Sequence, residues 1–243
     1  MEKIEKYQEA LESYNKALKI NPKFTHAWTS KGNTLTMLEK YPEALKSYNK
    51  SLELNPNDFE TWFNKGYVLE ELEKYIESIK AYDQSLELDP ESIDTWINKG
   101  LVLEKLNRYE ETLECFDKAL NIDSNDSEAW YNKGNVLIKL ERYQKALESY
   151  EKALKINPEF AYAWTSKGNT LTMLEKYPEA LKSYNKSLEL NPKYTDTLFN
   201  KGIVLKELGK YEESIKCFDK LLEINSDFEP ALKAKKEILE AKK

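Results

Sequence analysis

The chain has 243 residues, of which 33% are charged, 40% hydrophobic and 12% aromatic, and a disordered chain would be poorer in aromatic residues. Its 43 acidic residues outnumber its 37 lysines and arginines, and the net charge of -6 argues against a nucleic-acid-binding protein, which needs clustered positive charge. No apolar run approaches the roughly eighteen residues of a membrane span, the first residues do not open a signal peptide, and the two cysteines make no disulfide framework, so we expect a soluble cytoplasmic protein with no membrane partner.

A spacing of 34 residues recurs along the whole chain and defines a repeat. All five tryptophans keep this spacing, and a glycine stands four residues after each of them and after Leu198, which takes the next place in the series. Two columns of aromatic residues keep the same register, and a proline closes most units. The tryptophans are Trp28, Trp62, Trp96, Trp130 and Trp164, and the glycines are Gly32, Gly66, Gly100, Gly134, Gly168 and Gly202.

Residues 1–24 are the first element, and their apolar spacing predicts the last turn of one helix followed by a complete second helix. Each of the next six units predicts two helices, with prolines at the starts or after the ends of the second helices. Residues 229–243 predict a lone first helix with a polar outer face, which suits a terminal cap. The C-terminal end therefore looks capped and the N-terminal end open, as in a fragment of a longer array or an end used for contact. The six units are 25–58, 59–92, 93–126, 127–160, 161–194 and 195–228.

The glycine column predicts where the two helices of a unit approach each other. A glycine inside a helix costs about 1 kcal/mol of helix propensity, so its recurrence needs a packing reason. Gly32 in the first helix and Ala44 in the second are small residues that allow close approach, and the tryptophans are expected to act as structural anchors rather than as a binding platform.

These columns resemble those of the tetratricopeptide repeat (TPR) family, whose units are helix–turn–helix pairs of 34 residues. The resemblance covers essentially the whole chain and implies an all-α fold, a right-handed superhelical solenoid of antiparallel helix pairs, which we expect to form a single domain over residues 1–243. Lys31 and its equivalents stand where the family usually has leucine. We interpret this lysine column as tolerated, because a lysine stem can cover apolar surface while its ammonium reaches water.

Residues 27–56 are identical to residues 163–192. Packing alone leaves solvent-facing residues free to vary, so identity at those positions indicates recent duplication or deliberate design. The same surface is therefore presented twice.

Catalysis has little support in the sequence. His26 is the only histidine, so neither a histidine metal cluster nor a Ser-His-Asp set with a choice of bases is available. Nearly all glycines fall in predicted helices, which excludes a glycine-rich phosphate loop. Cys115 and Cys217 share one column three units apart, too far for a disulfide, and are expected to be packing residues. We therefore expect no enzyme activity, no cofactor and no metal site.

The resemblance implies a concave groove, lined by the first helices, that holds extended peptides or partner helices. The column after each tryptophan holds Thr29, Phe63, Ile97, Tyr131, Thr165 and Phe199. The next column holds Ser30, Asn64, Asn98, Asn132, Ser166 and Asn200, and the third holds Asn33, Tyr67, Leu101, Asn135, Asn169 and Ile203. Acidic residues on the rim are Glu60, Asp94, Glu128 and Asp196, with Glu70, Glu71 and Glu104 nearby.

The asparagines can hold a peptide backbone without reading its sequence, because each side-chain amide both donates and accepts hydrogen bonds. The alternative is that asparagine is simply the usual family residue there. The lysines or arginines with which some TPR domains clamp a carboxylate are missing from these columns. Aromatic contacts with an acidic edge instead suit a partner that is basic and partly apolar.

We therefore predict a protein–protein interaction scaffold that binds peptide or helical segments in its groove. The alternative is a structural repeat protein that self-associates through its open N-terminal and C-terminal helices. Leu232, Ile238 and Leu239 are expected on one side of the last helix, although Lys236 at the glycine position opposes close packing there.

Overall fold

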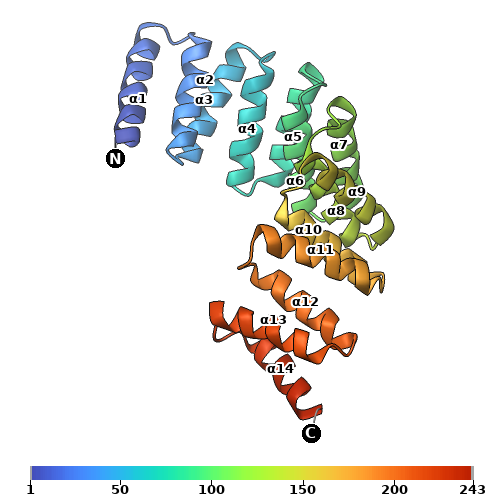
Figure 1. The fold of residues 1–243 in the computed structure, drawn as a ribbon. Coiled ribbons are helices and arrows are strands. Elements are labelled where there is room, and N and C mark those ends of the chain that lie inside the picture. Colours follow the sequence, from blue (N-terminus) through green and yellow to red (C-terminus); the bar gives the residue numbers. More distant parts are fainter. Residues whose placement is uncertain (1, 242–243) are drawn as a thin grey trace. The chain divides into compact units, whose positions relative to one another are not determined.

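The computed structural model describes residues 2–241, and every regular element in them is an α-helix (Figure 1). The chain divides into two compact units, Met1–Ser124 and Asn125–Lys243. The first unit contains α1 (Glu2–Ile20), α2 (Thr25–Met37), α3 (Tyr41–Leu54), α4 (Phe59–Glu71), α5 (Tyr75–Leu88), α6 (Ile93–Lys105) and α7 (Tyr109–Ile122). The second contains α8 (Ser127–Lys139), α9 (Tyr143–Ile156), α10 (Ala161–Met173), α11 (Tyr177–Leu190), α12 (Thr195–Glu207), α13 (Tyr211–Ile224) and α14 (Glu229–Ala241).

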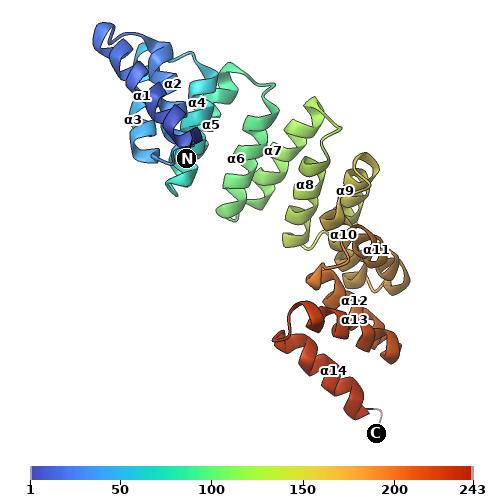
Figure 2. The same cartoon turned by 60° about the vertical axis from the view of Figure 1, so that its left-hand side comes forward.

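Within each unit the helices pack as pairs, and each pair packs on the next. The first helices also contact one another, α2 with α4 and α4 with α6 in the first unit, and α8 with α10, α10 with α12 and α12 with α14 in the second. Figure 2 shows α12, α13 and α14 stacked at the C-terminal end. The all-α solenoid of helix pairs is confirmed, whereas the single domain over 1–243 stays a prediction.

The turn inside each pair is closed by a residue with a left-handed backbone. At Glu73 φ is 57°, its N–H donates to the Glu70 carbonyl at 2.8 Å, and the N–H of Lys74 reaches back to the Leu69 carbonyl at 2.8 Å. These two bonds form a Schellman motif, which satisfies carbonyls at the end of the first helix. The equivalent left-handed residues are Glu39, Asn107, Glu141, Glu175 and Gly209.

An aromatic ring of the second helix lies against each column glycine. A methyl group added to Gly66 would stand 2.6 Å from ring carbons of Tyr82, which is fully buried. The sequence analysis expected close approach at Gly32 and Ala44, and the structure shows that the glycine makes room for this ring. Equivalent rings are Tyr48, Phe116, Tyr150, Tyr184 and Phe218.

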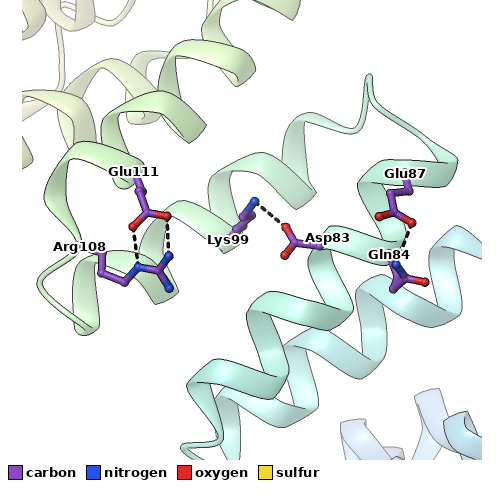
Figure 3. A network of polar contacts seen from close by, with 6 residues as sticks. All are labelled: Asp83, Gln84, Glu87, Lys99, Arg108 and Glu111. Carbon is purple, nitrogen blue, oxygen red and sulfur yellow. Dashed lines mark hydrogen bonds and ion pairs between the residues drawn. The ribbon is translucent and has the colours of Figure 1, made fainter.

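The lysine column has a role beyond the tolerance that we predicted. The ammonium of Lys65 lies over the Trp62 ring, 4.6 Å from its centroid, and the other four tryptophans have the equivalent lysine at 5.1–5.6 Å. Such cation–π contacts stabilise by about 0.5–1 kcal/mol at exposed sites. Lys99 also pairs with Asp83 of α5 at 2.6 Å, as Figure 3 shows beside the bidentate pair of Arg108 with Glu111.

Both ends differ from the sequence predictions. α1 is continuous, so no turn separates a first from a second helix in residues 2–20, and a helical Glu5 avoids the cost of a left-handed residue. On α14, Ile238 is buried, whereas Leu232 and Leu239 are exposed. These three residues therefore do not share one side, because Ile238 lies about 100° around the helix from Leu239.

Along the described residues, 2–241, no helix combines the length and the hydropathy that a bilayer crossing requires.

Candidate functional site

Asparagines of the first compact unit that were predicted to line a groove form hydrogen bonds within the protein. The side-chain oxygen of Asn33 accepts from the Tyr48 hydroxyl at 2.8 Å and from the Asn64 amide nitrogen at 3.2 Å, which ties α2 to α4. Asn98 turns back onto its own helix and donates to the Asp94 carbonyl at 2.8 Å. Part of the predicted asparagine ladder is therefore used to hold the array together.

The second unit repeats the arrangement. Asn169 accepts from the Tyr184 hydroxyl and from the Asn200 amide, both at 2.9 Å, and Asn135 accepts from the Tyr150 hydroxyl at 2.8 Å. In each case the side-chain oxygen of the asparagine is the acceptor. Asn132 is half-buried on α8.

The column after the tryptophans, which the sequence analysis assigned to the groove, contributes to packing between the helices. Phe63 lies on the Tyr82 ring with centroids 5.9 Å apart, and Phe199 lies on Phe218 and Phe228 at 6.0 and 5.4 Å. These rings are half-buried, so removing one would affect stability as well as binding. Tyr131 packs in the same way, and Ile97 is half-buried.

Residues of the predicted acidic rim differ in their surroundings, since some are exposed and Glu70 is paired with a lysine. Glu60, Asp94 and Glu128 are exposed in the first turns of α4, α6 and α8, where a negative charge also favours the helix N-terminus. Glu70, in contrast, pairs with Lys105 at 2.8 Å, so its charge is compensated. Tyr67, 37% exposed, has its pKa raised, mainly by desolvation and then by the neighbouring Glu71 carboxylate.

A cavity of about 290 Å³ opens on α8, α10 and α12 of the second unit. Aromatic and polar residues line it together. Tyr162 and Tyr194 meet edge to face with centroids 4.9 Å apart, and the pKa of Tyr194 is raised by burial and then by Tyr162. The lining residues are Tyr131, Tyr162, Thr165, Ser166, Asn169, Tyr194, Asp196, Phe199 and Asn200.

A second hollow of about 300 Å³ is also lined by Asn169 and Asn200. Met173, 53% exposed, and Ile203 supply its apolar surface. The two hollows therefore meet at the asparagine pair, with a mixed apolar and polar lining on each side.

Sequence reasoning missed Tyr162 and Tyr194. Tyr162 replaces the acids of the rim column, and Tyr194 occupies the column just before each first helix, where Asp58 and Asp126 cap their helices. The usable signal was that Phe160, Tyr194 and Phe228 put aromatic residues at this capping position in three consecutive units.

Within the described part of the chain, no three histidine, cysteine, aspartate or glutamate side chains are grouped so that they could hold a metal ion. Cys115 and Cys217 are free and buried.

Family models match the chain repeat by repeat. The family model for the tetratricopeptide repeat matches residues 26–58, 93–126, 127–160, 161–194 and 195–228, and two related models of the same description match 47–80 and 2–24. No curated protein matches the chain significantly.

Several solved structures are similar to the chain. YrrB, described as "a TPR protein with an unusual peptide-binding site", is 27% identical with a TM-score of 0.68, covering 79% of this chain and 99% of its own. MamA is 24% identical with a TM-score of 0.66, covering 70% and 92%. The C-terminal part of a TPR repeat-containing protein from Cytophaga hutchinsonii is 16% identical with a TM-score of 0.83, covering 94% of both chains. With its repeat columns, helix pairs and family matches in agreement, the chain belongs to the tetratricopeptide repeat family.

Proposed function

We propose that this chain is a non-catalytic scaffold that binds an extended peptide or a helical segment along its first helices. The observation that carries the proposal is the aromatic cavity on α8, α10 and α12, where Tyr162 presents a ring that is 55% exposed. The 27% identity to YrrB, whose description names a peptide-binding site, supports the same function.

The asparagine pair supplies the polar part of this proposed site. Because Asn169 accepts from Asn200, the Asn169 amide nitrogen and the Asn200 side-chain oxygen remain as one donor and one acceptor. One peptide unit of a ligand, which also has one donor and one acceptor, matches this pair.

The partner that we propose is basic and partly apolar. Asp196 is exposed at the aromatic cavity, and the exposed acids of the other first helices give the same sign of charge. Opposite charge speeds encounter, and aromatic walls retain apolar side chains. We place this interaction in the cytoplasm, where the two free thiols would stay reduced, and we expect no nucleic-acid partner.

The test is fluorescence anisotropy with a set of labelled ten-residue peptides that combine lysine or arginine with leucine or phenylalanine. Tyr162→Ala and Asp196→Asn should each weaken binding about tenfold or more, because each removes an anchor or a charge partner. His26→Ala is the matched control, since His26 in the repeat 25–58 occupies the position equivalent to Tyr162. Unchanged affinity in both variants would place binding elsewhere.

Self-association through the array ends is a second candidate function. Leu232 and Leu239 are 41% and 46% exposed on α14, and Ile4 is 52% exposed on α1. We propose that α14 of one copy contacts α1 of another. Light scattering across a dilution series should then show an oligomer that Leu232→Glu with Leu239→Glu converts to monomer, whereas a monomeric unaltered chain refutes it.

A further inference from the structure

In four of the 34-residue repeats the tryptophan ring is held by the same two contacts. Trp62 donates from its ring nitrogen to the carbonyl of Pro56 at 2.8 Å, while the ammonium of Lys65 lies over the ring face. The contact pairs the indole N–H with a fixed acceptor and the π-face with a cation. The same bond, at 2.8–2.9 Å, joins Trp28 to Pro22, Trp96 to Pro90 and Trp164 to Pro158.

The sixth repeat, residues 195–228, keeps the equivalent proline and lysine but has no tryptophan. Leu198 takes the tryptophan position, is 2% exposed and packs into the cluster of Phe218 and Ile238. Its side chain has no donor for the Pro192 carbonyl and no ring for Lys201 to cover. Pro192 and Lys201 are the equivalents of the proline and lysine that hold the indole elsewhere.

A cavity of about 510 Å³ lies at this position, between α11, α12 and α13. Leu188, Leu198 and Leu205 line it together with Pro192 and Lys201. Its volume falls within the range of small-molecule sites, roughly 300–1,000 Å³. The remaining lining residues are Asn185, Glu189, Glu213, Lys216, Cys217 and Lys220.

We propose that this cavity binds an indole ring, with the ring N–H on the Pro192 carbonyl and the Lys201 ammonium over its face. The site is separate from the aromatic cavity proposed for peptides, because the two cavities share no lining residue. Its residues from the first helix α12 are not those of the predicted groove columns, and most of its other residues come from the second helices α11 and α13. Lys201, Lys216 and Lys220 outnumber Glu189 and Glu213 in the lining, so an indole that carries a carboxylate is favoured over one that carries an amine.

Matched variants of the tryptophan column test the site with indole itself as the probe, by isothermal titration calorimetry. The unaltered chain should bind one indole. Leu198→Trp, which restores the residue of the other units, should bind none. Trp164→Leu, which copies the sixth unit into the fifth, should bind two. Benzofuran has no N–H and should bind the unaltered chain about fivefold more weakly, as expected for the loss of one neutral hydrogen bond.

The rate at which Cys217 is alkylated gives an independent test of where the ligand binds, because Cys217 lines the cavity. Saturating indole should slow alkylation of Cys217 at least severalfold and leave Cys115, which is not in that lining, unchanged. Lys201→Gln should weaken indole binding severalfold with helicity retained, and it serves as the second variant if Leu198→Trp does not fold.

Two further probes distinguish the source of the ring. Tighter binding of indole-3-acetate supports a free indole acid, and tighter binding of N-acetyl-tryptophanamide supports a tryptophan side chain of a partner. Absence of indole binding at millimolar concentration would overturn the proposal, as would equal binding by Leu198→Trp or equal protection of both cysteines.

Discussion

At the scale of single residues, each column glycine makes room for the ring that lies on it, but the ring does not approach every glycine equally closely. The space differs among the units, since a methyl group on Gly66 would meet Tyr82 at 2.6 Å, whereas one on Gly100 would meet Phe116 at 3.1 Å. The first distance demands that the buried ring move, and the second requires a shift of a few tenths of an ångström. The two positions are otherwise equivalent and lie in the same compact unit.

Gly66→Ala should therefore destabilise the protein by about 1–3 kcal/mol, the usual effect of overpacking. Gly100→Ala should be close to neutral, because the gain of about 1 kcal/mol in helix propensity offsets the smaller clash. Urea unfolding of the two variants checks this difference. Equal losses would mean that the ring of Tyr82 adapts as easily as that of Phe116.

Burial also acts on the thiol of Cys115, whose pKa it raises to about 11 from a usual value near 9. Because the folded pKa exceeds the unfolded one, the unfolded chain releases its proton first as the pH rises. The free energy of unfolding therefore keeps the full contribution of the protonated thiol below about pH 9. It falls by roughly 2 kcal/mol as the pH rises toward 11. Burial raises the pKa of Tyr48 and Tyr184 to about 12, which extends the loss above pH 10.

Unfolding free energies at pH 8, 9.5 and 10.5 should therefore decline in that order. Cys115→Ser is the control, since Ser47 and Ser149 occupy the same column and are buried there. This variant should show a shallower decline between pH 8 and 9.5. A slope identical to that of the unaltered chain would show that the thiol does not contribute.

At the scale of helices, the turn in each pair depends on one left-handed residue. The left-handed conformation is unfavourable for glutamate, which has a side chain. Gly209 adopts the same conformation without strain, because glycine has none. A methyl group on Gly209 would meet no atom within 4 Å, so the backbone alone decides the effect of a substitution there.

Glu141→Gly should stabilise the protein by about 0.5–1 kcal/mol, and Gly209→Ala should destabilise it by about 1 kcal/mol. Thermal unfolding measures both changes. The opposite signs are the test, because a change in surface charge alone would not destabilise Gly209→Ala.

At the scale of the whole molecule, stability is distributed among local clusters. Tyr48 and Val68 belong to a cluster near the start of the first unit, and Phe218 and Ile238 belong to one at the end of the second. Each cluster draws on neighbouring helices, as expected when every repeat contacts only its neighbours.

Trp96→Ala should therefore damage one part of the array. The half-buried ring packs against the cluster of Tyr82 and Val102 and bonds to the Pro90 carbonyl at 2.9 Å, so its loss should cost about 3 kcal/mol. Native-state hydrogen exchange should accelerate in α5 to α7 and remain unchanged in α10 to α12. A uniform acceleration across all helices would refute the local picture.

The amino-acid sequence by itself determined the repeat period, the helix pairs and the glycine column, because these depend on neighbours that recur at fixed spacing. It also predicted the columns of the groove. The tertiary structure decided how each column is used: Asn33 holds Asn64, Glu70 is neutralised by Lys105, and Tyr162 meets Tyr194. These contacts join side chains of successive repeats, 31 to 35 residues apart, and the cavity beside Leu198 arises from three helices together. Such features depend on the relative positions of side chains from separate helices, which a one-dimensional pattern does not contain.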